Sequence, residues 1–199
     1  MKKSSKTAVT MVVALLAIGG AFVIATSAPD TANDDNSRQE VAQQTTSEPT
    51  STTAATQPVV SATEKQLLYL IEEEKLAHDV YTVMYQKYGA RVFGNILESE
   101  STHQSKVLAL LQARNIPDPR STEIGIFKNQ ELQALYNQLI AQGNKSETEA
   151  FKAGVIIEEK DIADISTQLA TTTEQDVIDA LEVLRKGSEN HLRAFNRQL

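Results

Sequence analysis

The chain has 199 residues, a formal net charge of −7 at pH 7 and no cysteine. The lack of cysteine excludes disulfides, a thiolate nucleophile, a lipoprotein anchor and cysteine-ligated zinc or iron–sulfur sites. The acidic balance makes nucleic acid a poor partner, because phosphate backbones are bound through an excess of Lys and Arg, and we expect no nucleic-acid binding.

The N-terminal segment has the composition of an export signal. Lys2, Lys3 and Lys6 precede an apolar run over residues 8–25, and small residues follow this run. This order is typical of a signal peptide, but the run also approaches the length of a membrane span. We therefore expect residues 1–27 to be either a signal peptide or an N-terminal membrane anchor. Both alternatives predict an exported protein, which is secreted, periplasmic or anchored at the outer face of the cytoplasmic membrane.

Residues 28–62 are rich in Thr, Ser, Ala and Gln, with scattered Pro. This composition cannot bury enough apolar area to offset the entropy lost on ordering, so we expect a disordered linker. Residues 63–199 remain, and they are sufficient for one domain with its own hydrophobic core.

A first long helix is predicted after the capping box of Ser61 and Glu64, and it ends near Tyr88 because Gly89 follows. Its apolar residues recur at spacings of three and four, which is the pattern of a buried seam in a helix bundle. Neighbouring Glu72 and Glu73 are expected on a solvated face. The seam comprises Leu67, Leu70, Glu74, Ala77, Tyr81 and Met84.

A second helix is predicted to begin at Asn95, where Glu98 follows three residues later, and to end near Arg114. The short loop before it makes the first two helices antiparallel neighbours. The prolines at positions 117 and 119 stop this second helix, and a connector leads to a short helix over residues 130–142. The seam of the second helix comprises Ile96, Glu100, His103, Val107 and Leu110.

Two further long helices are predicted, over residues 147–169 and 174–197. Capping patterns that begin at Ser146 and Thr173 open them, and the short loop between them predicts an antiparallel hairpin. The fold class is therefore all-α: a four-helix bundle with an extra short helix in the connection between the second and third long helices. The seams are Val155, Glu158, Ile162, Ile165 and Leu169 in the third, and Val177, Leu181, Leu184, Ser188, His191 and Phe195 in the fourth.

Carboxylates and imidazoles interrupt these otherwise apolar seams. A lone carboxylate in a bundle core carries a large desolvation cost, whereas divalent cations neutralise such groups and bind oxygen and nitrogen ligands together. Glu100 and His103 are three residues apart, so they point the same way from one helical turn. The pattern predicts a site for two cations, iron or manganese, inside the bundle. The predicted metal ligands are Glu74, Glu100, His103, Glu158 and His191.

These residues resemble the ferritin-like superfamily, and in particular the di-iron bundles of the rubrerythrin and bacterioferritin type. The run from Glu74 to Tyr81 is similar to the first-helix pattern Glu-x-x-Ala-x-x-x-Tyr, and Glu100-Ser-Thr-His103 matches the second-helix Glu-x-x-His. Residues 72–81 and 187–195 more closely resemble a bacterial and archaeal ferritin-like family known only as a domain of unknown function.

The resemblance implies a role for each residue. Glu74 and His103 would hold one metal, Glu158 and His191 the other, and Glu100 would bridge the two. The implied chemistry is a reaction with oxygen or peroxide, as in a ferroxidase or a peroxide reductase. The core residue Tyr81 would act, if it acts at all, by a hydrogen bond to a ligand carboxylate. Rubrerythrins carry a cysteine-rich iron domain, which this chain lacks, so a redox cycle would need an external electron donor.

Ser188 departs from the ferritin-like pattern, because the family has Glu at this position of the fourth helix. Asp161, Glu189 or water would have to supply the missing ligand; otherwise the site has one tight and one weak metal. Glu159 is an alternative to Glu158, because a shift of one residue in the phase of this helix would turn Glu159 toward the seam.

The departure at Ser188 also keeps a non-enzymatic alternative open. In that alternative the protein is an extracytoplasmic binding or interaction module with a degenerate, hydrogen-bonded cluster in place of a metal site. A homodimer is compatible with either function.

Overall fold

The computed structural model describes residues 61–199, which form five helices and no strand. The signal or anchor segment predicted for residues 1–27 lies outside the described residues, and so does the predicted linker except for Ser61 and Ala62. Among the described helices, none combines the length and apolar character needed to cross a membrane. The helices are α1 (Ala62–Tyr88), α2 (Arg91–Ala113), α3 (Gln130–Gly143), α4 (Glu147–Leu169) and α5 (Gln175–Asn196).

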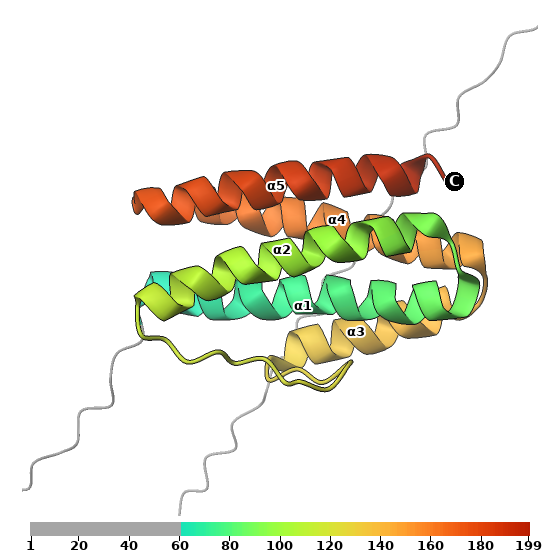
Figure 1. Cartoon of the computed structure of the whole chain (residues 1–199), viewed down its shortest axis with the longest axis horizontal. Coiled ribbons are helices and arrows are strands. Elements are labelled where there is room, and N and C mark those ends of the chain that lie inside the picture. The colour runs from blue at the N-terminus through green and yellow to red at the C-terminus, as the bar shows by residue number, and fades with distance from the viewer. Residues whose placement is uncertain (1–60) are drawn as a thin grey trace, which may run out of the picture. The chain divides into compact units, whose positions relative to one another are not determined.

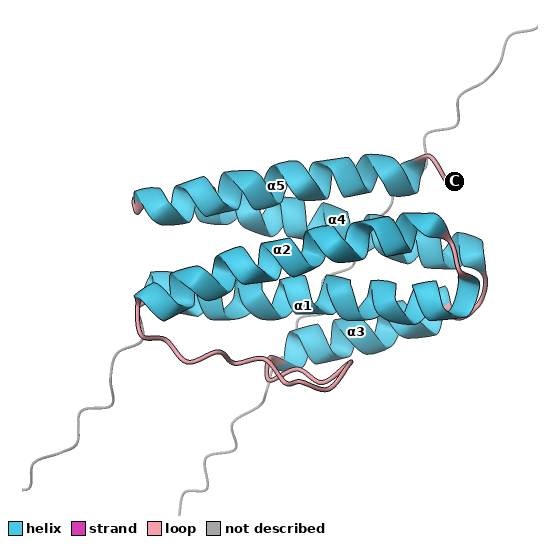
Figure 2. Ribbon diagram, viewed as in Figure 1, coloured by secondary structure: helices cyan, strands magenta, loops and turns pink. Residues whose placement is uncertain are grey.

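The four long helices form a bundle, with α1 packed mainly against α2 and α4 mainly against α5 (Figure 1). Contacts of α2 with α5 and of α1 with α4 join these two hairpins. Helix α3 lies outside the bundle against α1 and α4, and the long loop between α2 and α3 runs along the same side (Figure 2). The all-helical class and the extra short helix in this connection are thus confirmed.

The helix ends follow the local sequence in most places. Ser61 Oγ accepts a hydrogen bond from the Glu64 backbone N–H over 3.0 Å, and Ser146 Oγ accepts one from that of Glu149 over 3.2 Å. Gly89 ends α1 in the left-handed conformation, with φ of 68°, which costs little only for glycine.

Two predicted helix starts are wrong. Helix α2 begins at Arg91 rather than Asn95, because its first turn packs the fully buried ring of Phe93 into the core and needs no side-chain cap. The N-cap of α5 is Glu174 rather than Thr173, and its side chain accepts hydrogen bonds from Thr63 and Arg114 instead of capping the helix.

The core consists of two apolar clusters with a polar layer between them. One cluster gathers around Tyr81, Phe93 and Phe195, and the other around Leu70 and Leu181. All four long helices cross from one cluster to the other, and each contributes polar side chains at the crossing. The buried residues of this layer include Glu74, Glu100, His103, Glu158, Asp161, Ser188 and His191.

The buried face of α4 is rotated slightly from the predicted seam. Val155 and Ile162 are only half-buried, whereas Ile157 and Asp161 are buried. The α3 helix packs against α4 as well, so α4 buries two adjoining faces and a single apolar stripe does not define its phase.

The prediction of a solvated face for Glu72 and Glu73 is also wrong, since both are buried. Glu72 accepts hydrogen bonds from the backbone N–H groups of Lys128 and Asn129, over 2.6 and 2.9 Å. Glu73 pairs with Lys160 of α4, whose Nζ lies 3.0 Å from Glu73 Oε1. The connector, α3 and α4 therefore cover a face of α1 that its own sequence marks as polar.

Candidate metal centre

The polar layer brings the five predicted ligands together from four helices. Glu74 comes from α1, Glu100 and His103 from α2, Glu158 from α4 and His191 from α5. None of them is more than 7% exposed. Burial of this depth is costly for ionisable groups unless they are paired or bind a cation.

His103 stands at the centre of the first group. Its Nδ1 lies 3.2 Å from Oε2 of Glu74 and 3.4 Å from Oε2 of Glu100. One ligand atom from each of these three residues lies within 4.8 Å of the other two, which is a spacing that one cation can span.

His191 stands at the centre of the second group. Its Nδ1 lies 2.9 Å from Oε1 of Glu100 and 3.5 Å from Oε2 of Glu158, and ligand atoms of the three again lie within 4.8 Å of one another. Glu100 therefore belongs to both groups and presents a different oxygen to each imidazole. The two rings stack with their centroids 5.6 Å apart.

Several atoms of the polar layer have no hydrogen-bond partner among the described residues. They include Oε1 of Glu74, Oδ1 of Asp161 and Nδ1 of His191. His191 Nδ1 lies close to Glu100, yet the contact lacks hydrogen-bond geometry. An unsatisfied buried polar atom costs about 1–3 kcal/mol, so such atoms in a native core require a partner, which can be a water, a proton or a cation. A cation between the imidazoles and carboxylates would satisfy this requirement.

Neighbouring side chains hold the carboxylates in place. The fully buried Tyr81 donates a hydrogen bond to Oε1 of Glu158 over 2.6 Å and leaves Oε2 facing His191. Ser188, which is also buried, donates a hydrogen bond to Oδ2 of Asp161. Such contacts orient metal ligands and raise their affinity.

The cluster has strongly perturbed ionisation in the absence of a cation. Burial raises the pKa of Glu74 and Asp161 well above the usual range, and it raises that of Glu158 to about 7. Burial would also raise the pKa of Glu100, but the close imidazoles of His103 and His191 outweigh it and lower the pKa to about 2.

The histidines show the converse effect. Burial opposes their charged form, yet their carboxylate partners raise the pKa of His103 to about 11 and that of His191 to about 9. The Nδ1 atoms of both imidazoles, which face the carboxylates, would therefore be protonated without a metal. Binding of a cation to these nitrogens would release the protons.

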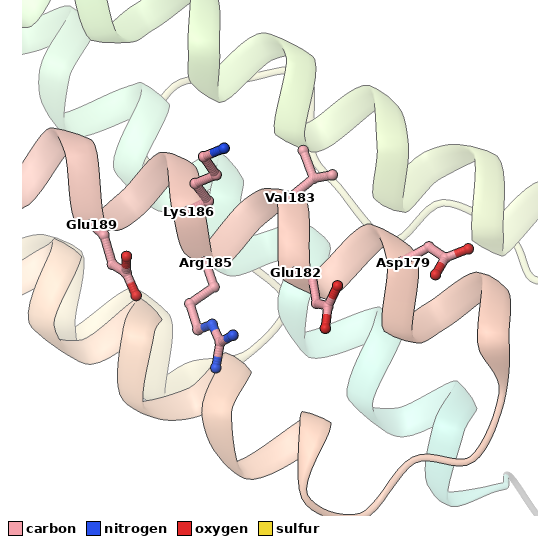
Figure 3. Close-up of a pocket in the computed structure, with 6 residues that line it drawn as sticks. All are labelled: Asp179, Glu182, Val183, Arg185, Lys186 and Glu189. Atoms are coloured by element: carbon pink, nitrogen blue, oxygen red, sulfur yellow. The ribbon is translucent and has the colours of Figure 1, made fainter.

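The structure separates the alternative ligands. Asp161 faces the buried layer, where the charge of Glu74 contributes to its raised pKa. Glu159 is exposed on α4 and does not reach the cluster. Glu189 lines a pocket on the outer surface of α5 together with Glu182 and Arg185 (Figure 3). Glu73, which sequence reasoning missed, adds a buried carboxylate next to Glu74; its only signal was its place in the run of three glutamates.

Comparisons with known proteins give a family but no activity. Residues 63–199 match the family described as an uncharacterised protein domain, DUF2202. The chain is 44% identical over 143 residues to the uncharacterised protein MJ0754 of Methanocaldococcus jannaschii. The aligned residues cover 71% of this chain and 77% of that protein. It is also similar to the crystal structure of the hypothetical protein MJ0754, with a TM-score of 0.69 over 72% of this chain and 83% of that chain.

Proposed function

Because this chain belongs to the DUF2202 family, whose members described above are uncharacterised, we propose its function from the buried cluster. We propose that the protein is a ferritin-like bundle that binds two redox-active cations, iron or manganese. The observation that carries this proposal is the position of Glu100. One carboxylate shared by two histidine–carboxylate groups is the arrangement that a bridged dinuclear site requires.

Each cation has its own terminal ligands in this proposal. Glu74 and His103 hold one, and Glu158 and His191 hold the other, with Glu100 between them. Asp161, fixed by Ser188, provides the carboxylate that the usual fourth-helix glutamate would supply. The free Oδ1 of Asp161 and its burial support this role.

Bound iron or manganese would supply electron transfer to oxygen or peroxide. The residues of the chain prepare the site for this chemistry. The two apolar clusters on either side of the polar layer exclude bulk water from the site. Tyr81 fixes one oxygen of Glu158 by a hydrogen bond. The chain has no cysteine, so electrons must come from an external donor.

We further propose that the protein acts outside the cytoplasm. The support for this is the sequence of residues 1–27 alone, where three lysines precede a long apolar run. The predicted linker over residues 28–62 would then separate the domain from the membrane or from the cleavage point.

The direct test is metal analysis of the full chain. The purified protein is loaded with Fe²⁺ or Mn²⁺ without oxygen, desalted, and analysed for metal per chain. We expect two cations per chain, one for each group. Metal at background level, in a protein that remains helical by circular dichroism, would refute the proposal. The Glu159→Gln variant is the matched control, because Glu159 is exposed and adjacent to Glu158.

Ser188 favours a second candidate function, an extracytoplasmic binding or interaction module with a degenerate site. In that protein the cluster only stabilises the fold. Thermal unfolding separates the two functions, because a bound cation stabilises by about 2.7 kcal/mol when its concentration is 100 times Kd. An equal Tm in chelator and in Fe²⁺ supports the module, whereas a higher Tm in Fe²⁺ supports the metal centre.

A further inference from the structure

A surface groove between α2 and α5 lies next to the buried centre. The groove has a volume of about 510 Å³, and its walls include Ser99, Thr102, Lys186 and Asn190. His103 also lines it, although this residue is only 3% exposed. The imidazole that faces Glu74 and Glu100 through Nδ1 is therefore also part of the wall that separates the centre from solvent.

Gly187 lies opposite this imidazole on α5 and lines the same groove. A Cβ atom added at Gly187 would lie 2.5 Å from Cε1 of His103 and closer still to Nε2. Both separations are shorter than real Cβ contacts allow. The ring cannot simply move away, because its other side faces the carboxylates of Glu74 and Glu100.

Gly187 has no other structural reason to be glycine. It lies inside α5, where glycine is destabilising relative to alanine, and its φ is not positive. The missing side chain is thus explained by the space that His103 occupies.

From these contacts we infer that the groove is the opening through which small uncharged polar molecules reach the centre, and that Gly187 is a positioning residue that keeps His103 at its floor. The part of the inference that concerns access to metal rests on the proposed function. The exposed side chains of the groove include one carboxylate, Glu98, and one ammonium, Lys186, so their charges balance and would not select an ion. Its hydroxyl and amide groups suit a hydrogen-bonding molecule of the size of hydrogen peroxide.

The first test needs no metal. Tm is measured in chelator for the full chain and for the Gly187→Ala, His103→Ala and double variants. Gly187→Ala should lower Tm when His103 is present, because the new methyl group displaces the ring. It should raise Tm in the His103→Ala background, where only the better helix propensity of alanine remains. A rise in both backgrounds would overturn the role of Gly187.

The second test measures access and stays informative if His103→Ala does not fold. Hydroxyl radicals are generated by pulsed photolysis of hydrogen peroxide in a solution of the metal-free full chain, and oxidative modification of each histidine is followed by peptide mass spectrometry, with the partly exposed His78 as the internal reference. Thr102→Trp fills the groove, whereas Glu182→Trp places the same side chain on an adjoining face of α5, at a residue that does not line the groove (Figure 3).

We expect Thr102→Trp to slow modification of His103 at least tenfold relative to His78, while Glu182→Trp leaves the rate unchanged. Equal rates in the two variants, or a His103 that never reacts, would overturn the assignment of the opening. Since neither test uses metal, the failure of either one is distinct from a failure to find metal in the loaded protein.

Discussion

The hydroxyl of Tyr81 donates a hydrogen bond to Oε1 of Glu158 over 2.6 Å, while Oε2 of the same carboxylate faces His191. The protein thus fixes one oxygen of this ligand and leaves the other for the centre. Tyr81→Phe removes only the hydroxyl, so we expect the fold to persist and the affinity for Mn²⁺ at the Glu158–His191 position to fall about 10- to 100-fold. Isothermal titration with Mn²⁺ measures this loss.

Tyr85 of the same helix is the matched control, because it is 43% exposed and belongs to neither group of candidate ligands. Tyr85→Phe should leave the Mn²⁺ affinity unchanged. An unchanged affinity in Tyr81→Phe as well would mean that the Tyr81 hydroxyl does not orient Glu158 for metal.

Glu100 and Glu74 should differ in how many cations they control. Glu100 contributes an oxygen to both groups, whereas Glu74 belongs to one. We therefore expect Glu100→Gln to lose both tightly bound cations and Glu74→Gln to lose one and retain the other. Metal analysis after desalting gives both numbers. Retention of one tightly bound cation in Glu100→Gln would exclude the bridging role.

Helix periodicity was sufficient to predict the inward direction of the five candidate ligands. In α1 and α5, apolar residues flank the polar position on both sides, as Leu70 and Ala77 do around Glu74, so the phase of the helix is well defined. The fold class followed from the same seams.

The errors in predicted burial arose where a second neighbour covers a helix. Glu72 and Glu73 are polar, and only the packing of the connector, α3 and α4 against α1 buries them. The same cause affects the buried face of α4, where α3 provides a second contact surface. The contact between Gly187 and His103 joins two helices far apart in sequence, and no local pattern indicates it.

Glu72 should stabilise the domain without affecting metal. Its two oxygens accept the backbone N–H groups of Lys128 and Asn129 at the start of α3. Glu72→Gln places an amide NH₂ group against one of these donors and removes the charge, so we expect a loss of about 1.5–3 kcal/mol in the free energy of unfolding. Urea denaturation measures it, and the metal content of the folded protein should stay the same.

Glu131→Gln is the control for this change. Glu131 is exposed in the first turn of α3, so its substitution removes only a favourable interaction with the helix dipole, worth about 0.3–1 kcal/mol. If both variants lose the same free energy, the buried hydrogen bonds of Glu72 contribute nothing beyond charge.

Asp79 should make the stability of the domain sensitive to acid. Burial alone would raise its pKa, but the nearby His78 imidazole and hydrogen bonds from Lys75 and the Gly125 backbone N–H outweigh burial and lower the pKa below its ordinary value of 3.8. Its carboxylate thereby attaches the connector to α1. Because the pKa of Asp79 is lower in the folded than in the unfolded chain, its carboxylate stabilises the fold fully at pH values above the unfolded-state pKa. This stabilisation is lost as the pH falls through the folded-state pKa.

We therefore expect Asp79→Asn to lower Tm at pH 6 and the difference from the unchanged protein to shrink as the pH falls from about 5 towards 3. Thermal unfolding followed by circular dichroism across this range gives the difference directly, and the comparison cancels the titration of all other groups. Asp118→Asn is a suitable control, because the Asp118 carboxylate binds Arg120 within the connector itself and does not hold the connector to α1. A Tm difference for Asp79→Asn that stays constant from pH 6 to pH 3 would show that the Asp79 contact depends on shape and hydrogen bonding rather than on charge.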